Sequence, residues 1–214
     1  MQVASIQVEK FQIKEYVVSA TRTAQIERVT SETDIAIDLN LDGNGDIDIK
    51  TGSGFFDHMM TAFARHAGFD LVVRCTGDLE VDDHHTVEDV GLVLGQAFAE
   101  ALGDKMGITR FGDVLVPMDE ALVFAAVDIS GRGQLHFRVD VPIKMIGNFE
   151  TTLAEEFFIA FCSKAGVTLH LESLAGKNTH HILEATFKAA ARALREAVAI
   201  DPKISGIPST KGVL

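Results

Sequence analysis

The stretch DHMMTAFARHAGFDL, residues 57–71, recurs later in the chain as EEFFIAFCSKAGVTL, residues 155–169, and this repetition is the main evidence for how the chain folds. Five of the fifteen aligned positions are identical, and both copies place apolar residues at helical spacing. Each copy then reaches a glycine, Gly68 or Gly166, followed by a short apolar segment. This pattern predicts a helix with a glycine C-cap and then a strand, twice in one chain.

The similarity extends on both sides of this stretch. Downstream, HHTVE (residues 84–88) aligns with HHILE (residues 180–184) once a two-residue gap is allowed. Upstream, the glycine turn at 43–45 aligns with the one at 131–133, and strand patterns flank each turn, which predicts β-hairpins. The helices are predicted at 55–67, 84–102, 153–164 and 180–199. We therefore predict an α+β fold of two pseudo-symmetric β-β-α-β-α halves, an internal duplication with sheets packed against helices.

The repeat divides the chain into four parts. Residues 1–19 form an N-terminal extension, 20–117 the first half, 118–200 the second half and 201–214 a C-terminal tail. We expect the tail to contribute to the substrate site.

Composition excludes several classes of protein. The 214 residues include 19 Lys and Arg against 31 Asp and Glu, a net charge of −12. So acidic a chain is poorly suited to nucleic acid or to anionic membrane surfaces. Apolar runs fall far short of the roughly 20 residues that span a bilayer, and no signal-peptide core is present, so we predict a cytoplasmic protein. Cys75 and Cys162 are expected to be buried, inert thiols.

Each HHxxE motif has the pattern of a metal site. At about 100° per residue, its glutamate projects between the two histidines and away from the apolar helix face. Adjacent histidines diverge too far to share one ion comfortably. Two such helices therefore predict a dinuclear site, in which each ion takes one histidine from each helix or from helices of neighbouring subunits. Imidazole and carboxylate without thiolate indicate Mn, Fe, Zn or Co, and manganese suits the carboxylate content best.

Other residues are weaker candidates. His58 and Glu156 occupy equivalent repeat positions, so each could be a further ligand to one ion, although Glu156 could also be a surface residue at a helix start. Lys188 projects from the metal face of its helix. Arg110, Arg132, Ser209 and Lys211 lie near turns or in the tail and could join Lys188 around a phosphate group. Taken singly, each could equally be a solvated surface residue.

Six segments, in this order, resemble the imidazoleglycerol-phosphate dehydratase family over about residues 20–214: TGSGFFDHM, DDHHTVEDVG, PMDEAL, SGRG, GKNTHHILEATFKA and PSTKGVL. The resemblance implies a hydro-lyase of histidine biosynthesis that converts D-erythro-imidazole-glycerol phosphate to imidazole-acetol phosphate and water. It also implies two Mn²⁺ ions per active site and a homo-oligomer of 24 subunits with active sites between subunits.

The resemblance further implies site residues in this chain. The metal ligands are His58, His84, His85, Glu88, His180, His181 and Glu184, with Glu156 as a possible eighth. Relatives carry Glu-His-Phe-Phe where this chain has Glu-Glu-Phe-Phe, so the ligand type at Glu156 differs from theirs. The substrate and phosphate contacts are Glu32, His58, His66, Arg110, Arg132, Lys188, Ser209 and Lys211, with Arg110 serving a neighbouring subunit. The candidate catalytic carboxylates are Glu32, Glu88 and Glu184, with Glu32 as acid/base.

The chemistry explains the need for metal ions. The carbon that loses its proton has no adjacent carbonyl, so the imidazole ring must relay electrons, and the expected route runs through a metal-bound imidazolate. Two alternatives remain open at this stage: a dinuclear metallohydrolase of a phosphate ester, and a metal-stapled storage or structural assembly. A storage shell would have no need of several cations around one pocket.

Overall fold

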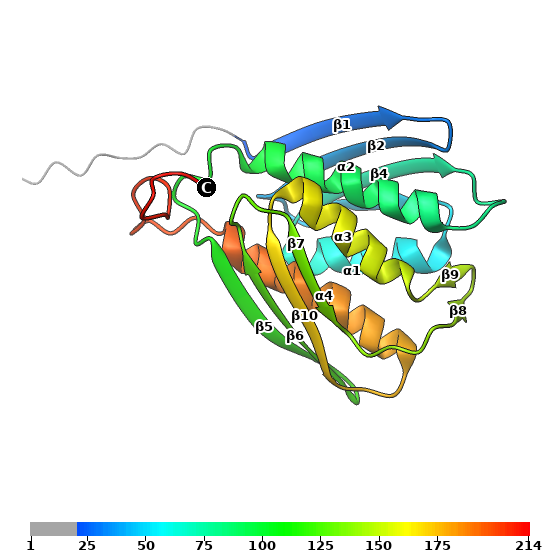
Figure 1. Ribbon diagram of the computed structural model, residues 1–214. Helices are drawn as coiled ribbons and strands as arrows, with labels where there is room; N and C mark the ends of the chain where they lie inside the picture. Colours follow the sequence, from blue (N-terminus) through cyan, green and yellow to red (C-terminus); the bar gives the residue numbers. More distant parts are fainter. Residues whose placement is uncertain (1–20) are drawn as a thin grey trace, which may run out of the picture.

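Four helices form a layer between two four-stranded sheets in the computed structural model, which describes residues 21–214 (Figure 1). The first half consists of β1 (Thr23–Val29), β2 (Thr33–Asn40), β3 (Ile47–Lys50), α1 (Gly54–Ala67), β4 (Asp70–Gly77) and α2 (His84–Leu102). The second half consists of β5 (Phe111–Met118), β6 (Ala121–Asp128), β7 (Gln134–Arg138), the short pair β8 (Met145–Ile146) and β9 (Phe149–Glu150), α3 (Leu153–Ala165), β10 (Thr168–Ala175) and α4 (Thr179–Val198). The extension expected over residues 1–19 lies outside the described residues.

The two sheets have equivalent strand orders, β1-β2-β4-β3 and β5-β6-β10-β7. The predicted α+β fold of two halves is therefore confirmed, and the matching orders are consistent with duplication. Each half begins with one more strand than predicted, β1 or β5. Four of the seven β1 residues are polar or charged, and β5 contains a glycine and a proline, so neither segment carries a strong strand pattern.

The predicted hairpins around the glycine turns are wrong. Strand β4 lies between β2 and β3, antiparallel to the first and parallel to the second, and β10 separates β6 from β7 in the same way. The turn between β2 and β3 is built around Asp70 at the start of β4. Its Oδ1 accepts hydrogen bonds from the backbone N–H groups of Asn44, Gly45 and Asp46 at 2.7–2.9 Å. The turn between β2 and β3 is therefore held by hydrogen bonds to the first residue of β4.

Strand β5 pairs with β6 along its whole length. Residues 111–117, assigned to the first half from the sequence, thus belong to the second sheet. The division of the chain into domains otherwise stays a prediction.

The helices form within about two residues of their predicted bounds. Helices α1 and α3 end at Gly68 and Gly166 in the left-handed conformation, with φ of 73° and 67°. Helix α2 packs on α3 and α1 on α4, around a core of phenylalanine side chains that includes Phe63, Phe157 and Phe161. None of the helices described between residues 21 and 214 is both long and apolar enough to span a bilayer.

Candidate metal centre

The two histidine pairs stand in the first turns of α2 and α4, which both begin on the side of the molecule away from the C-terminus (Figure 1). A side-chain oxygen just before each helix accepts a hydrogen bond from the first histidine's backbone N–H. Asp82 does so for His84 at 2.8 Å, and Asn178 for His180 at 3.0 Å. These contacts satisfy backbone N–H donors that have no partner inside the helix. They also hold in place the backbone from which the histidine side chains project.

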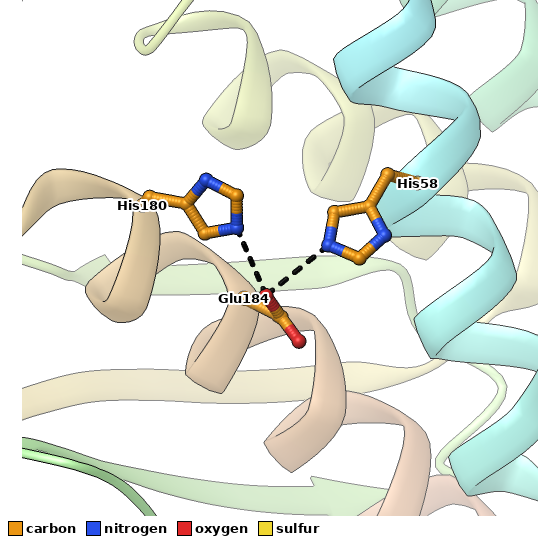
Figure 2. A group of neighbouring side chains, drawn as sticks. All are labelled: His58, His180 and Glu184. Carbon is orange, nitrogen blue, oxygen red and sulfur yellow. Dashed lines mark hydrogen bonds and ion pairs between the residues drawn. The ribbon is translucent and has the colours of Figure 1, made fainter.

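One compact group of possible ligands is present among the described residues, formed by His58, His180 and Glu184. Their ligand atoms all lie within 4.8 Å of one another. Glu184 Oε2 is 3.2 Å from His58 Nε2 and 3.0 Å from His180 Nε2, and Figure 2 shows both rings directed at the carboxylate from α1 and α4. His58 of the first half thus contacts the HHxxE motif of the second half.

Glu184 is an anion in a largely buried position, 8% exposed. Burial by itself raises the pKa of this carboxyl. Contacts with Lys188, whose Nζ lies 2.7 Å from Oε1, and with the two histidines outweigh burial and hold the pKa at about 2. Two imidazole nitrogens and an ionised carboxylate form a donor set that suits a first-row divalent ion.

The counterpart in the other half is more open. His84 Nε2 and Glu88 Oε2 are 3.7 Å apart, and both side chains are more than two-fifths exposed. Glu156 is half-buried on α3, which packs against α2, and it makes no hydrogen bond or ion pair within residues 21–214. The structure therefore places Glu156 on the helix next to His84 but does not gather these three residues into a second compact group.

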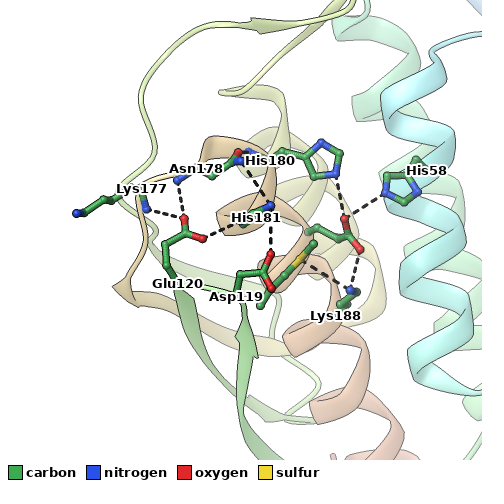
Figure 3. A network of polar contacts seen from close by, with 10 residues as sticks. His58, Asp119, Glu120, Lys177, Asn178, His180, His181 and Lys188 are labelled. Atoms are coloured by element: carbon green, nitrogen blue, oxygen red, sulfur yellow. Dashed lines mark hydrogen bonds and ion pairs between the residues drawn. The ribbon is translucent and has the colours of Figure 1, made fainter.

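The second histidine of each pair meets a carboxylate outside its own helix. His85 Nδ1 lies 3.0 Å from Asp78 and 4.0 Å from Glu32. His181 Nδ1 lies 2.8 Å from Glu120 Oε2 (Figure 3). The hydrogen bond to Asp78 raises the pKa of His85, and the one to Glu120 raises the pKa of His181.

Glu120 and Asp78 were not among the predicted site residues. The PMDEAL segment contained Glu120, but spacing alone gave no partner for it. The contact with His181, followed by hydrogen bonds that Glu120 accepts from the backbone N–H groups of Asn178 and Lys177, lowers the pKa of Glu120 to about 2.

The predicted phosphate residues fall into two sets. His66 belongs to the metal end with Lys188. Burial lowers the pKa of His66, and the charges of Lys188 and Arg192 lower it further. Arg110 belongs to the tail instead: its Nη1 donates to the carbonyl of Pro208 at 2.9 Å, beside Ser209.

Arg132 and Lys211 also lie with this second set. The guanidinium of Arg132 donates a hydrogen bond to the carbonyl of Ser130. The adjacent Gly131 lies against the C-terminal Leu214, so closely that an added Cβ would clash with it. In the tail, Lys211 donates its backbone N–H to Ser209 Oγ. Because the N–H of Arg110 bonds to the carbonyl of Ala197 near the end of α4, this set lies about 25 Å along the helix from His180 and about 14 Å from Lys188. In one chain the tail set is therefore remote from the metal-binding end of α4.

Comparison with known proteins identifies the chain's relatives. Residues 51–194 match the family model described as imidazoleglycerol-phosphate dehydratase. The imidazoleglycerol-phosphate dehydratase of Acidiphilium cryptum is 62% identical over 195 residues, which cover 91% of this chain and 100% of the relative. That of Desulforamulus reducens is 56% identical over 193 residues, covering 90% and 98%.

Solved structures of the same enzyme have the same fold. The crystal structure of imidazoleglycerol-phosphate dehydratase from Staphylococcus aureus matches with a TM-score of 0.76 at 40% identity, over 84% of this chain and 99% of that one. The Pyrococcus furiosus enzyme, in complex with (S)-C348, matches with a TM-score of 0.75 at 40% identity, over 88% and 100%.

Proposed function

The chain belongs to the imidazoleglycerol-phosphate dehydratase family, and on that basis we propose how its residues bind substrate and metal. The protein is a hydro-lyase of histidine biosynthesis, which converts D-erythro-imidazole-glycerol phosphate to imidazole-acetol phosphate and water. The observation that carries the proposed site is the convergence of His58, His180 and Glu184, all within the matched segment.

We propose that each active site holds two divalent ions, with manganese as the metal. When bound at a ring nitrogen of the substrate, such an ion supplies Lewis acidity that lowers the pKa of the ring N–H. The donor chemistry supports this choice, because imidazoles and carboxylates without thiolate suit manganese. The proposed ligands are His58, His84, His85, Glu88, Glu156, His180, His181 and Glu184.

The chain's own groups have separate proposed tasks. Glu184 stays ionised and so presents a negative oxygen to the ion site. Glu32 is exposed at the turn between β1 and β2, 4.0 Å from His85. We assign to its carboxylate the removal of the proton from the substrate carbon next to the one that loses the hydroxyl. Lys188, whose Nζ lies 2.7 Å from Glu184 Oε1, offers a positive charge to the phosphate group. His66, near Lys188 and Glu184, offers a ring N–H, and together the two residues orient the substrate.

The active site is proposed to lie between subunits of a homo-oligomer of 24 chains. The distance along α4 between the metal-binding His180 and the tail set, roughly 25 Å, supports this, because a small substrate bound at the metal end cannot also reach the tail set of the same chain. Arg110, Arg132, Ser209 and Lys211 would then complete the site of a neighbouring chain. The cytoplasmic location stays a prediction.

Two measurements test the proposal. With Mn²⁺ present, the protein should turn imidazole-glycerol phosphate into a ketone that retains its phosphate. Release of inorganic phosphate would indicate a metallohydrolase instead, and absence of turnover a storage or structural protein. Arg110→Ala and His180→Ala should each abolish turnover.

Mixed assembly of these two variants tests the shared site. Unfolding and refolding them together should restore about a quarter of the sites, because one variant contributes the intact metal end and the other the intact tail. Mixtures as inactive as either variant alone would contradict a site shared between chains.

A further inference from the structure

The second histidine of each HHxxE motif is held at Nδ1 by a carboxylate that lies outside its helix. We propose that Glu120 and Asp78 are positioning residues that fix His181 and His85 in the tautomer that can bind an ion through Nε2. The inference rests on the proposed metal sites and adds two residues that act on them through the histidines.

Glu120 makes three well-defined contacts (Figure 3). Its Oε2 lies 2.8 Å from Nδ1 of His181, while its Oε1 accepts the backbone N–H groups of Lys177 and Asn178 at 3.0 and 2.7 Å. Asn178 in turn caps α4 by accepting from the backbone of His180. One carboxylate thus holds the loop, the start of the helix and the ring in a single arrangement.

The chemistry of the contact determines the tautomer. An ionised carboxylate can only accept hydrogen bonds, so Nδ1 of His181 must carry the hydrogen. In the neutral ring, Nε2 then has its lone pair available, which is the form a metal ligand needs. Histidines that bind metals usually donate their other ring N–H to a carboxylate or carbonyl in this way.

The other half uses the same arrangement with a different residue. Asp78, in the loop before α2, lies 3.0 Å from Nδ1 of His85. In strand order, the β5–β6 turn with Glu120 corresponds to the β1–β2 turn with Glu32. Asp78 is the hydrogen-bond partner of His85 Nδ1, and Glu32 Oε2 lies farther from that nitrogen, at 4.0 Å. The carboxylate of Glu32 is therefore free to contact the substrate. Glu120 thus positions a histidine, whereas the equivalent Glu32 acts on the substrate.

The variant Glu120→Gln separates positioning from folding. The glutamine oxygen can still accept from Lys177 and Asn178, but its NH₂ group faces Nδ1 of His181 and favours the tautomer with hydrogen on Nε2. We expect Mn²⁺ affinity, measured by calorimetry on the metal-free protein without substrate, to fall about 10- to 100-fold. The melting temperature without metal should stay close to that of the parent.

Two further variants complete the experiment. Asp78→Asn should weaken Mn²⁺ binding in the same way and serves as the test if Glu120→Gln does not fold. Glu172→Gln, at a carboxylate on the outer face of β10 that pairs with Arg138, should leave affinity unchanged. Parent-like Mn²⁺ affinity in folded Glu120→Gln and Asp78→Asn would overturn the inference. Failure of the parent itself to bind Mn²⁺ would overturn the metal sites as well.

Discussion

Replacing Gly95 with alanine should push helix α2 away from helix α3. An added Cβ at this position would lie 2.4 Å from the carbonyl oxygen of Phe161, 2.9 Å from Cβ of Lys164 and 3.0 Å from the backbone nitrogen of Ala165. Ordinary contact begins at 3.4 Å, so the closest overlap is about 1 Å. Backbone atoms inside a packed helix cannot turn aside as a flexible side chain can.

The expected cost follows from two opposing effects. Overpacking a core typically costs about 1–3 kcal/mol, and the upper part of that range applies because the closest atom belongs to backbone. Alanine is preferred to glycine inside a helix by about 1 kcal/mol, which offsets part of the cost. We therefore expect the free energy of unfolding to fall by about 2 kcal/mol.

Urea unfolding followed by circular dichroism measures this change. All proteins should be compared at one concentration, because the apparent stability of an oligomer depends on the concentration of its subunits. Gly54→Ala is the control, since an added Cβ there meets nothing within 4 Å. A Gly95→Ala protein as stable as the parent would refute the close packing of α2 on α3, and with it the placement of Glu156 beside the α2 histidines.

Four further predictions concern the site and the cysteines. His84→Ala and His180→Ala should each bind less metal than the parent by elemental analysis, and full occupancy in both would exclude a two-ion site. Glu156→Gln should weaken Mn²⁺ binding while Glu156→His retains it, with Glu155→Gln, about 100° around the helix, as the unchanged control. Chelation should lower the particle mass seen by light scattering, and Mn²⁺ should restore it; a large metal-free particle would count against coupling of metal to assembly. Because burial raises the pKa of Cys75 to about 11, roughly one thiol in a thousand is ionised at pH 8, so disulfide reagents should react quickly only after denaturation.

The candidate site was only partly predictable from the chain. Aligning the two copies paired His58 with Glu156 and so made His58 a candidate ligand, and the structure places His58 beside His180 and Glu184. Nothing in the spacing indicated that Asp78 and Glu120 would meet the second histidines, because their contacts depend on how separate turns pack beside the helix starts.

The two-half organisation, the four helices and the glycine at the end of α1, α2 and α3 were predictable from the amino-acid sequence alone. Helical hydrogen bonds join residues four apart, so apolar spacing and a C-capping glycine such as Gly68 are sufficient local signals. Only the tertiary structure decided the order of the strands and the separation of the phosphate-binding residues. A strand takes its partners from distant segments, and Asp70 of β4 organises the turn between two other strands. Likewise, the distance from Arg110 to His180 is set by where the chain crosses the far end of α4, which no local pattern encodes.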